Sequence, residues 1–275
     1  MNFMNRTNPI GFFDSGIGGL TVVRAVTNLM PNENIVYFGD TARVPYGSKS
    51  NDTVIEYSIQ AANFLLRKNI KLLVVACNTA SSVALNELRR FLTVPVIGMI
   101  EPGSQMALSE SRSRKIGVIG TYATINNKAY SKQIKKLDPK VQVYEKACPL
   151  FVPLAEEGMT NHKAAELIAK EYLTELKEKN IDSLILGCTH YPLLSDIIQK
   201  VMGKKVKLID SGTPAAKIVE DYLNGRQLRN NSVHEGQHEY YVSDLPAKFK
   251  LIAERFLGKR IKNIHKVELE ELTNE

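Results

Sequence analysis

The stretch LLVVACNTASS, Leu72–Ser82, contains the pattern that decides the fold. A short apolar run ends in a cysteine, which is followed by a polar pair and then by a segment typical of a helix. The stretch SLILGCTHYPLL, Ser183–Leu194, repeats that order. Its cysteine, Cys188, follows Cys77 by 111 residues, about the length of one domain. The repeat predicts two similar halves.

Further apolar runs of strand length occur along the chain. They are continuous rather than alternating, which is typical of strands that are covered on both faces in parallel sheets. The candidate strands are Ile10–Phe13, Ile35–Phe38, Lys71–Ala76, Val94–Met99, Lys115–Ile119, Val141–Ala147, Ser183–Leu186 and Lys205–Ile209.

Helical patterns separate these strands. Asn51 or Asp52 is expected to cap a helix whose apolar positions recur every three or four residues. His162 to Lys179 is a second amphipathic segment, and Thr213 followed by Pro214 is typical of a helix start. Alternation of strands and helices predicts an α/β fold of the doubly wound type.

The expected architecture is two similar doubly wound α/β domains with mainly parallel sheets and the active site in the cleft between them. We assign residues 1–98 plus 210–275 to the first domain and residues 99–209 to the second. The return to the first domain is inferred because Asp210-Ser211-Gly212 resembles Asp14-Ser15-Gly16. Beyond it we expect a loop over Arg226–Gly236, a strand over Tyr240–Ser243 and a helix over Pro246–Leu257.

Composition excludes several classes of protein. The 275 residues carry a net charge of +7, but the basic residues are scattered, which argues against a nucleic-acid partner. The longest apolar run, Leu72–Cys77, is too short for a membrane span, and the N-terminus lacks the pattern of a signal peptide. Three cysteines do not form a disulfide framework, so we expect a cytoplasmic protein. Without CxxC or HExxH spacing, no metal site is expected.

Small polar residues follow the predicted strands. Ligands of open α/β sheets bind at the carboxyl ends of strands, where helix N-termini present free N–H groups to anions. The implied ligand is small and carries carboxylates or phosphates. The glycines of Gly16–Gly19 lack the dinucleotide register, and the preceding Asp14 would repel a pyrophosphate. The segments at these ends are Asp14–Gly19, Gly39–Asp40 with Arg43–Ser48, Cys77–Thr79, Gly120–Thr124, Gly187–Pro192 and Asp210–Gly212.

Two of the three cysteines are candidates for chemistry. Cys77 and Cys188 each end a strand where a helix N-terminus can lower the pKa of a thiol, whereas Cys148 has the setting of an inert core residue. Two thiols that face one pocket could invert a carbon centre, since one removes a proton and the other delivers one from the opposite face. This reaction needs no cofactor, but the site must stabilise a carbanion.

The residues together resemble the glutamate racemases of the aspartate/glutamate racemase family. The resemblance extends from about Ile10 to about Leu257. Its motifs occur in the family's order and are DSGIGGLTV, GDTARVPYG, ACNTAS, GTYAT, CPLFVPLAEEG, GCTHYPLL and DSG. The resemblance implies interconversion of L- and D-glutamate without a cofactor, which supplies D-glutamate for peptidoglycan synthesis. Many family members are dimers, so a homodimer is allowed.

The resemblance also implies roles for matching positions. Cys77 acts on the D-enantiomer and Cys188 on the L-enantiomer, and Asp14 and His190 assist the thiols. Glu156 matches a further acidic position, but the adjacent Glu157 leaves its role undefined. The residues implied to contact substrate are Asp14, Ser15, Tyr46, Gly47, Asn78, Thr79, Thr189 and His190. For Tyr46 a packing role is the alternative, and Gly47 could act through its backbone alone.

Three other functions are weighed against glutamate racemisation. An enzyme of the same group could act on aspartate or on another acidic carbon. A non-catalytic amino-acid-binding protein is disfavoured because both cysteines are present. A nucleic-acid-binding protein is supported only by the positive charge.

Overall fold

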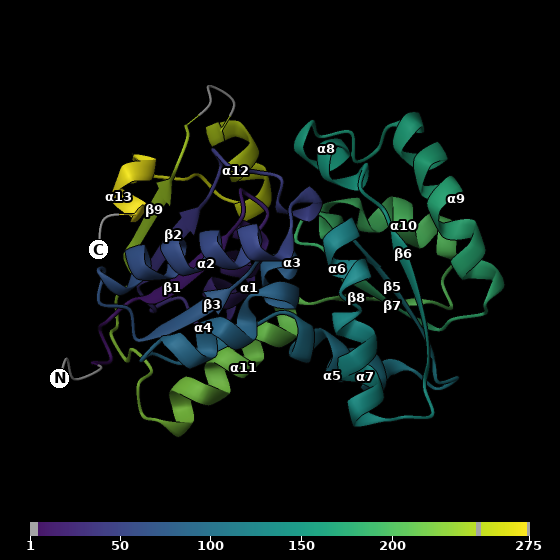
Figure 1. Ribbon diagram of the computed structural model, residues 1–275, viewed down its shortest axis with the longest axis horizontal. Helices are drawn as coiled ribbons and strands as arrows, with labels where there is room; N and C mark the ends of the chain where they lie inside the picture. The colour runs from purple at the N-terminus through teal and green to yellow at the C-terminus, as the bar shows by residue number, and fades with distance from the viewer. Residues whose placement is uncertain (1–4, 246–248, 274–275) are drawn as a thin grey trace.

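The computed structural model describes residues 5–245 and 249–273, which form two α/β domains that lie side by side (Figure 1). Every strand pairing in both sheets is parallel. The first sheet has the order β10 (Ile264–Lys266), β9 (His238–Val242), β2 (Ile35–Gly39), β1 (Ile10–Asp14), β3 (Leu72–Val75) and β4 (Val96–Gly98). The second has the order β6 (Gln142–Ala147), β5 (Lys115–Gly120), β7 (Ser183–Gly187) and β8 (Lys207–Asp210).

Helices cover both faces of each sheet, so the predicted doubly wound architecture is confirmed. Those packed on the first sheet are α1 (Leu20–Leu29), α2 (Asn51–Leu66), α3 (Asn78–Val83), α4 (Leu85–Phe91), α11 (Gly212–Gly225), α12 (Phe249–Leu257) and α13 (Leu269–Thr273), with the short helix η1 (Tyr46–Ser48). Those of the second domain are α5 (Ile100–Glu110), α6 (Tyr122–Asn126), α7 (Ala129–Leu137), α8 (Phe151–Glu156), α9 (Lys163–Glu178) and α10 (Ser195–Met202), with the short helix η2 (Tyr191–Leu194).

The two domains repeat one topology. The order β2-β1-β3-β4 in the first sheet has the same connectivity as β6-β5-β7-β8 in the second, so β3 and β7, which lead into the two cysteines, are equivalent. The similarity of Asp210-Ser211-Gly212 to Asp14-Ser15-Gly16 was expected to mark the return to the first domain, but the two segments end strands that are not equivalent. Asp210 ends β8 of the second sheet, which is equivalent to β4 rather than to β1. The chain then returns, because α11 packs on α1 and both β9 and β10 join the first sheet.

The predicted elements are observed with small shifts at their ends. Helix α2 is capped by Ser50, whose side chain accepts from the Thr53 N–H, rather than by Asn51 or Asp52. Helix α11 begins at Gly212, one residue before the predicted cap. His162 caps α9 as its predicted span implies. Of the predicted segment Pro246–Leu257, residues 246–248 lie outside the described part, and the remainder is α12.

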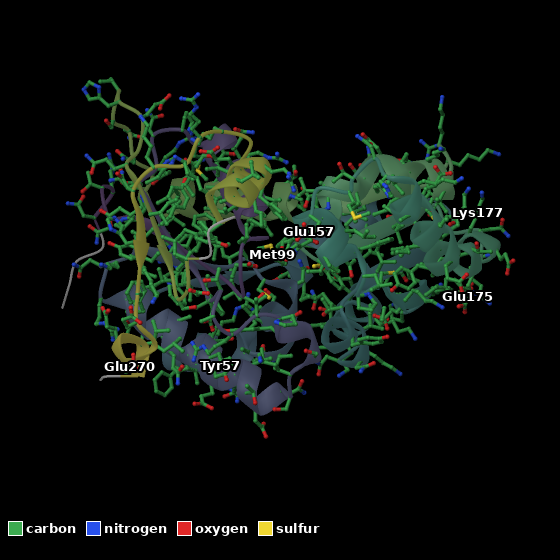
Figure 2. All side chains as sticks on the ribbon, turned by 90° about the horizontal axis from the view of Figure 1, so that it is seen from above. Tyr57, Met99, Glu157, Glu175, Lys177 and Glu270 are labelled. Atoms are coloured by element: carbon green, nitrogen blue, oxygen red, sulfur yellow. The ribbon has the colours of Figure 1, made fainter. Side chains whose placement is uncertain are left out.

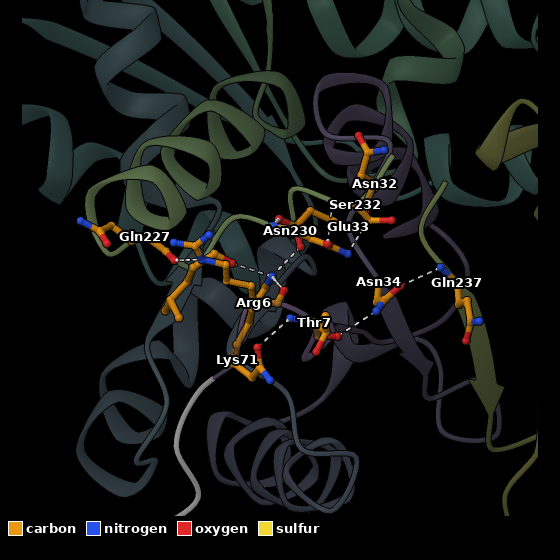
Figure 3. A network of polar contacts seen from close by, with 12 residues as sticks. Arg6, Thr7, Asn32, Glu33, Asn34, Lys71, Gln227, Asn230, Ser232 and Gln237 are labelled. Carbon is orange, nitrogen blue, oxygen red and sulfur yellow. Dashed lines mark hydrogen bonds and ion pairs between the residues drawn. The ribbon is translucent and has the colours of Figure 1, made fainter. Parts of the chain in front are cut away.

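A buried ion pair anchors the edge of the first sheet that lies at the amino ends of its strands (Figure 3). Lys71, which precedes β3, places its Nζ 2.6 Å from Glu33 Oε2, and both side chains are inaccessible to solvent. Its Nζ also donates to the carbonyls of Arg6 and Leu228, while the Asn230 N–H donates to Glu33 Oε1. The pair therefore holds the loop after α11 and the start of the chain to this sheet. Burial lowers the pKa of Lys71, and its contacts with Glu33 oppose that effect.

The described residues contain no helix that is long and apolar enough to cross a membrane. Their longest helices, α2 and α9, are amphipathic segments of 16 residues each.

Candidate active site

The predicted site residues, except Asp14 and Glu156, line a pocket at the carboxyl ends of the strands, where the two domains meet. The pocket is narrow, with a cavity volume of about 30 Å³. Cys77 reaches it from the first domain and Cys188 from the second. Its lining is Ser15, Val44, Pro45, Tyr46, Gly47, Cys77, Asn78, Thr79, Thr121, Val152, Cys188, Thr189 and His190.

Cys77 occupies the N-cap of α3, directly after the buried strand β3. Its Sγ accepts from the Ala80 N–H at 3.4 Å, and the thiol donates to Ser15 Oγ at 3.4 Å. The cap geometry fixes the sulfur at the pocket wall, and only 5% of the residue is exposed. The thiol is therefore oriented by hydrogen bonds at an anion-binding helix end.

The helix N-terminus acts to lower the pKa of Cys77, as expected, through the Ala80 N–H, but burial outweighs this effect. Burial, and after it the nearby charge of Asp14, raise the pKa of this thiol to about 12. The hydrogen bonds of the sulfur with Ser15 Oγ and with the Ala80 N–H act in the opposite direction but do not offset burial. Burial also raises the pKa of Cys148, which is not among the residues that line the pocket and donates to the Lys146 carbonyl at 3.7 Å. The prediction of an inert Cys148 agrees with this geometry.

Cys188 belongs to a chain of three side chains. Its Sγ lies 3.7 Å from His190 Nδ1, and His190 Nε2 lies 2.9 Å from Glu156 Oε1. Burial lowers the pKa of His190, but the contacts with Cys188 and Glu156 outweigh it and raise the pKa to about 10. The contacts with Cys188 and Glu156 therefore favour the charged form of His190. Of the two adjacent glutamates, Glu156 contacts His190 in this way, while its role in the reaction stays a prediction.

Asp14 lies behind the pocket rather than in its wall. Its Oδ2 accepts from the Gly16 N–H at 2.9 Å, while Oδ1 has no hydrogen-bond partner among the described residues. Burial raises the pKa of Asp14, and the charge of His190 acts in the opposite direction. Asp14 interacts electrostatically with both Cys77 and His190.

The glycine-rich loop of the first domain packs directly on the second cysteine's motif. A Cβ added at Gly18 would lie 2.6 Å from His190 Nδ1 and closer still to Thr189 Oγ1. The Thr21 hydroxyl donates to the Thr189 carbonyl at 3.2 Å. Gly18 thus permits the close approach of the domains, which explains the glycine cluster without a nucleotide.

Polar side chains from both domains complete the lining. Tyr130 donates to Asn78 Oδ1 at 2.6 Å, which leaves the amide N–H groups of Asn78 as donors. The hydroxyls of Thr79 and Thr121 lie 2.9 Å apart, and a Cβ at Gly47 would meet the Thr121 Cβ at 2.7 Å. Residues from opposite domains are therefore in hydrogen-bond or van der Waals contact here.

Tyr46 has a different arrangement from the other predicted contacts. Its hydroxyl donates to Asp40 Oδ2 at 2.5 Å, and its ring packs against those of Phe13 and Tyr57. The side chain thus lines the pocket while its polar atom is engaged elsewhere. The packing role that was the alternative for Tyr46 is the one that this geometry favours.

Four lining residues were not predicted as site residues: Val44, Pro45, Thr121 and Val152. Thr121 could have been found, because it follows β5 at the position equivalent to Ser15 after β1. Val152 lies on α8 and carries no sequence signal of its own. Within residues 5–245 and 249–273, no group of three acidic, histidine or cysteine side chains could hold a metal ion.

Comparison with known proteins assigns the family. The family model for Asp/Glu/Hydantoin racemases matches residues 20–219. The chain belongs to this racemase family. The glutamate racemase of Geobacter metallireducens is 51% identical over 261 residues, which cover 95% of this chain and 97% of that protein.

Solved structures place the chain among the glutamate racemases of this family. The crystal structure of glutamate racemase from Francisella tularensis in complex with D-glutamate is 41% identical, with a TM-score of 0.91, and the match covers 96% of this chain and 99% of that one. A glutamate racemase isoform from Bacillus anthracis has a TM-score of 0.93 at 37% identity, with the same coverage of both chains. The predicted resemblance and enzyme class, an amino-acid racemase, are confirmed.

Proposed function

We propose that this racemase interconverts L- and D-glutamate by proton transfer between the substrate α-carbon and two thiols. The observation that carries the proposal is that Cys77 and Cys188 line one pocket from opposite domains. A single base reaches only one face of a carbon centre, whereas two facing bases can invert it. Glutamate as the substrate is supported by the relatives named glutamate racemase, which are 51% and 45% identical to this chain.

The reaction needs two proton transfers. The Cys77 thiolate takes the α-proton of D-glutamate, and the C–H electron pair stays on carbon as a carbanion conjugated with the α-carboxylate. The Cys188 thiol then gives its proton to the opposite face, which yields L-glutamate and a Cys188 thiolate. The reverse sequence starts from L-glutamate. Hydrogen-bond donors that surround the carboxylate stabilise the carbanion.

Substrate binding should activate Cys77. Its raised pKa of about 12 has Asp14 as the second cause after burial. The α-ammonium of glutamate is attracted by Asp14, and this positive charge offsets the effect of Asp14 on the thiol. An opposite charge within about 4–6 Å favours the charged form of an ionisable group. The thiolate would therefore form mainly in the substrate complex.

Cys188 is activated differently, through the imidazolium of His190. That imidazolium is held by Glu156, which keeps the ring aimed at the sulfur. The two thiols thus have distinct partners, Asp14 and Ser15 for one, and His190 with Glu156 for the other. The asymmetry arises because the partners of Cys77 lie at the end of β1, whereas His190 follows β7 and Glu156 ends α8.

The carboxylates of the substrate fit the remaining polar groups. The amide N–H groups of Asn78 and the hydroxyls of Thr79 and Thr189 are suitable donors, together with Ser15 and the backbone at Gly47. Tyr46 would shape the wall beside them. Each is a neutral donor of the kind that binds carboxylates without competing for the α-proton.

The remaining expectations accompany this proposal. We assign residues 1–98 plus 210–275 to the first domain and 99–209 to the second, supported by the sheets to which β4, β8 and β9 belong. The bacterial origin of the relatives supports a supply of D-glutamate for peptidoglycan. Three free thiols suit a reducing cytoplasm. The homodimer stays a prediction, which sedimentation equilibrium would test.

Circular dichroism with purified protein tests the function. L-Glutamate and D-glutamate, each incubated separately with a chelator and no added pyridoxal phosphate or nucleotide, should both converge on zero optical signal. Activity that disappears with the chelator and returns with a metal would contradict the cofactor-free reaction. An unchanged signal from both enantiomers would favour a non-catalytic binding protein.

A further inference from the structure

Helix α12 packs with the first domain but also contacts residues of the second domain that surround Cys188. Its buried residues, among them Ala253 and Leu257, pack with α1 and the first core. At its carboxyl end, Arg255 and Phe256 extend towards α8 and His190. Figure 1 shows α12 and α8 facing each other across the junction of the domains, and in Figure 2 Glu157, which follows α8, lies at that junction.

Arg255 binds the carboxyl end of α8. Its Nη1 donates to the Glu156 carbonyl at 2.9 Å and lies 3.5 Å from the Ala155 carbonyl. A helix leaves its last carbonyls without intrahelical partners, and a cation is stabilising there. Helix α8 ends in a Schellman turn, in which the Gly158 N–H donates to Ala155 and the Met159 N–H to Leu154.

The guanidinium fits against Gly158. This glycine has a φ of +72°, and a Cβ there would lie 2.6 Å from Arg255 Nη1 and 2.7 Å from its Cζ. The left-handed backbone favours glycine, and a side chain at this position would displace the guanidinium from its present place. The turn after α8 and the arginine from α12 are therefore complementary in shape as well as in charge.

Phe256, the residue after Arg255, packs against His190, which is bound to Glu156. Its ring meets the His190 ring edge to face, with centroids 5.1 Å apart. Two neighbouring residues of α12 thus contact Glu156 through its backbone and His190 through its ring. Between them lies the 2.9 Å contact of Glu156 Oε1 with His190 Nε2.

We infer that Arg255 is a positioning residue for the Cys188 side of the reaction. It fixes the backbone of Glu156, so that the Glu156 carboxylate holds His190 with Nδ1 directed at the Cys188 sulfur. The titratable groups that face His190 are Glu156, Asp14 and Cys188, and Arg255 is linked to them by its hydrogen bond to the Glu156 carbonyl. This inference rests on the proposed two-thiol mechanism, but it is testable without racemisation.

The test is the rate at which iodoacetamide alkylates each cysteine as a function of pH, followed by mass spectrometry of the separate peptides. In Arg255→Ala we expect alkylation of Cys188 at neutral pH to slow by about tenfold, because His190 would no longer be held with Nδ1 directed at the sulfur. Alkylation of Cys77 should be unchanged within the same sample, since its partners are Ser15 and Ala80. Glu156→Gln should slow Cys188 in the same direction, and Arg255→Lys should restore part of the rate.

Arg260→Ala is the matched control, because Arg260 is exposed and lies shortly after α12. It should leave both cysteines unchanged. Equal changes at Cys77 and Cys188 in folded Arg255→Ala would mean that Arg255 only holds the domains together, and an unchanged Cys188 would overturn the inference. Racemisation assays then separate the two proposals, since a protein without racemase activity could still show the selective effect at Cys188.

Discussion

Replacing Gly18 by alanine should lower the racemisation rate, because the added methyl group would displace His190. The added Cβ would lie 2.6 Å from His190 Nδ1, so the imidazole must move by about 0.8 Å to reach an ordinary contact of 3.4 Å. A misplacement of about 1 Å in an active site can cost about 100-fold in rate, which is about 2.7 kcal/mol of transition-state stabilisation. Overpacking should cost about 1–3 kcal/mol of folding free energy.

Gly16→Ala is the control within the same loop. Its Cβ would lie 3.4 Å from Val44 Cγ2, an ordinary contact, and its N–H would still donate to Asp14. Initial racemisation rates by circular dichroism, with urea unfolding of each variant, compare the two. We expect Gly16→Ala to stay within about threefold of the parent and Gly18→Ala to lose about 100-fold while folded. A folded Gly18→Ala enzyme of near-normal activity would refute the argument that this glycine positions His190.

Three further predictions follow from the site and the core. Cys77→Ala and Cys188→Ala should each abolish racemisation, whereas Cys148→Ala should keep most activity, and a single alanine variant with near-normal turnover would rule out the two-thiol assignment. L-Aspartate should be a much poorer substrate than L-glutamate, because a side chain one methylene shorter leaves buried donors unpaired at about 1–3 kcal/mol each; equal turnover would favour an aspartate enzyme. Lys71→Met should lower the free energy of unfolding, measured in urea, by about 3–5 kcal/mol, because Glu33 would remain buried without its cation. Combining it with Glu33→Leu should recover part of the loss. Unchanged stability of Lys71→Met would contradict the role of this pair.

The sequence predicted the central strands because their burial leaves a local signal. Strands such as β1 and β7 are apolar along their whole length, and the helices between them have clear periodicity. Strand β10 was missed because Ile264–Lys266 lies at the edge of the first sheet and is largely exposed. An edge strand of three residues with one apolar side chain has no such signal.

The site was predictable to the extent that it lies at strand ends. Cys77 and Cys188 follow buried strands directly, so their approximate places follow from topology. The contact of Glu156 with His190 joins residues 34 positions apart through the packing of α8, which no local pattern reports. Likewise, the raised pKa of Cys77 depends on burial by both domains, whereas the local helix N-terminus predicts the opposite direction.

Racemisation in heavy water tests the two-thiol mechanism most directly. The proton removed by one thiol stays there, while the other thiol, already exchanged with solvent, delivers deuterium to the opposite face. Early in turnover, starting from either enantiomer, NMR or mass spectrometry after chiral separation should find deuterium in the product and almost none in recovered substrate. Equal early deuterium in substrate and product would indicate a single base that serves both faces, and would contradict the assignment of Cys77 and Cys188 to opposite faces of the α-carbon.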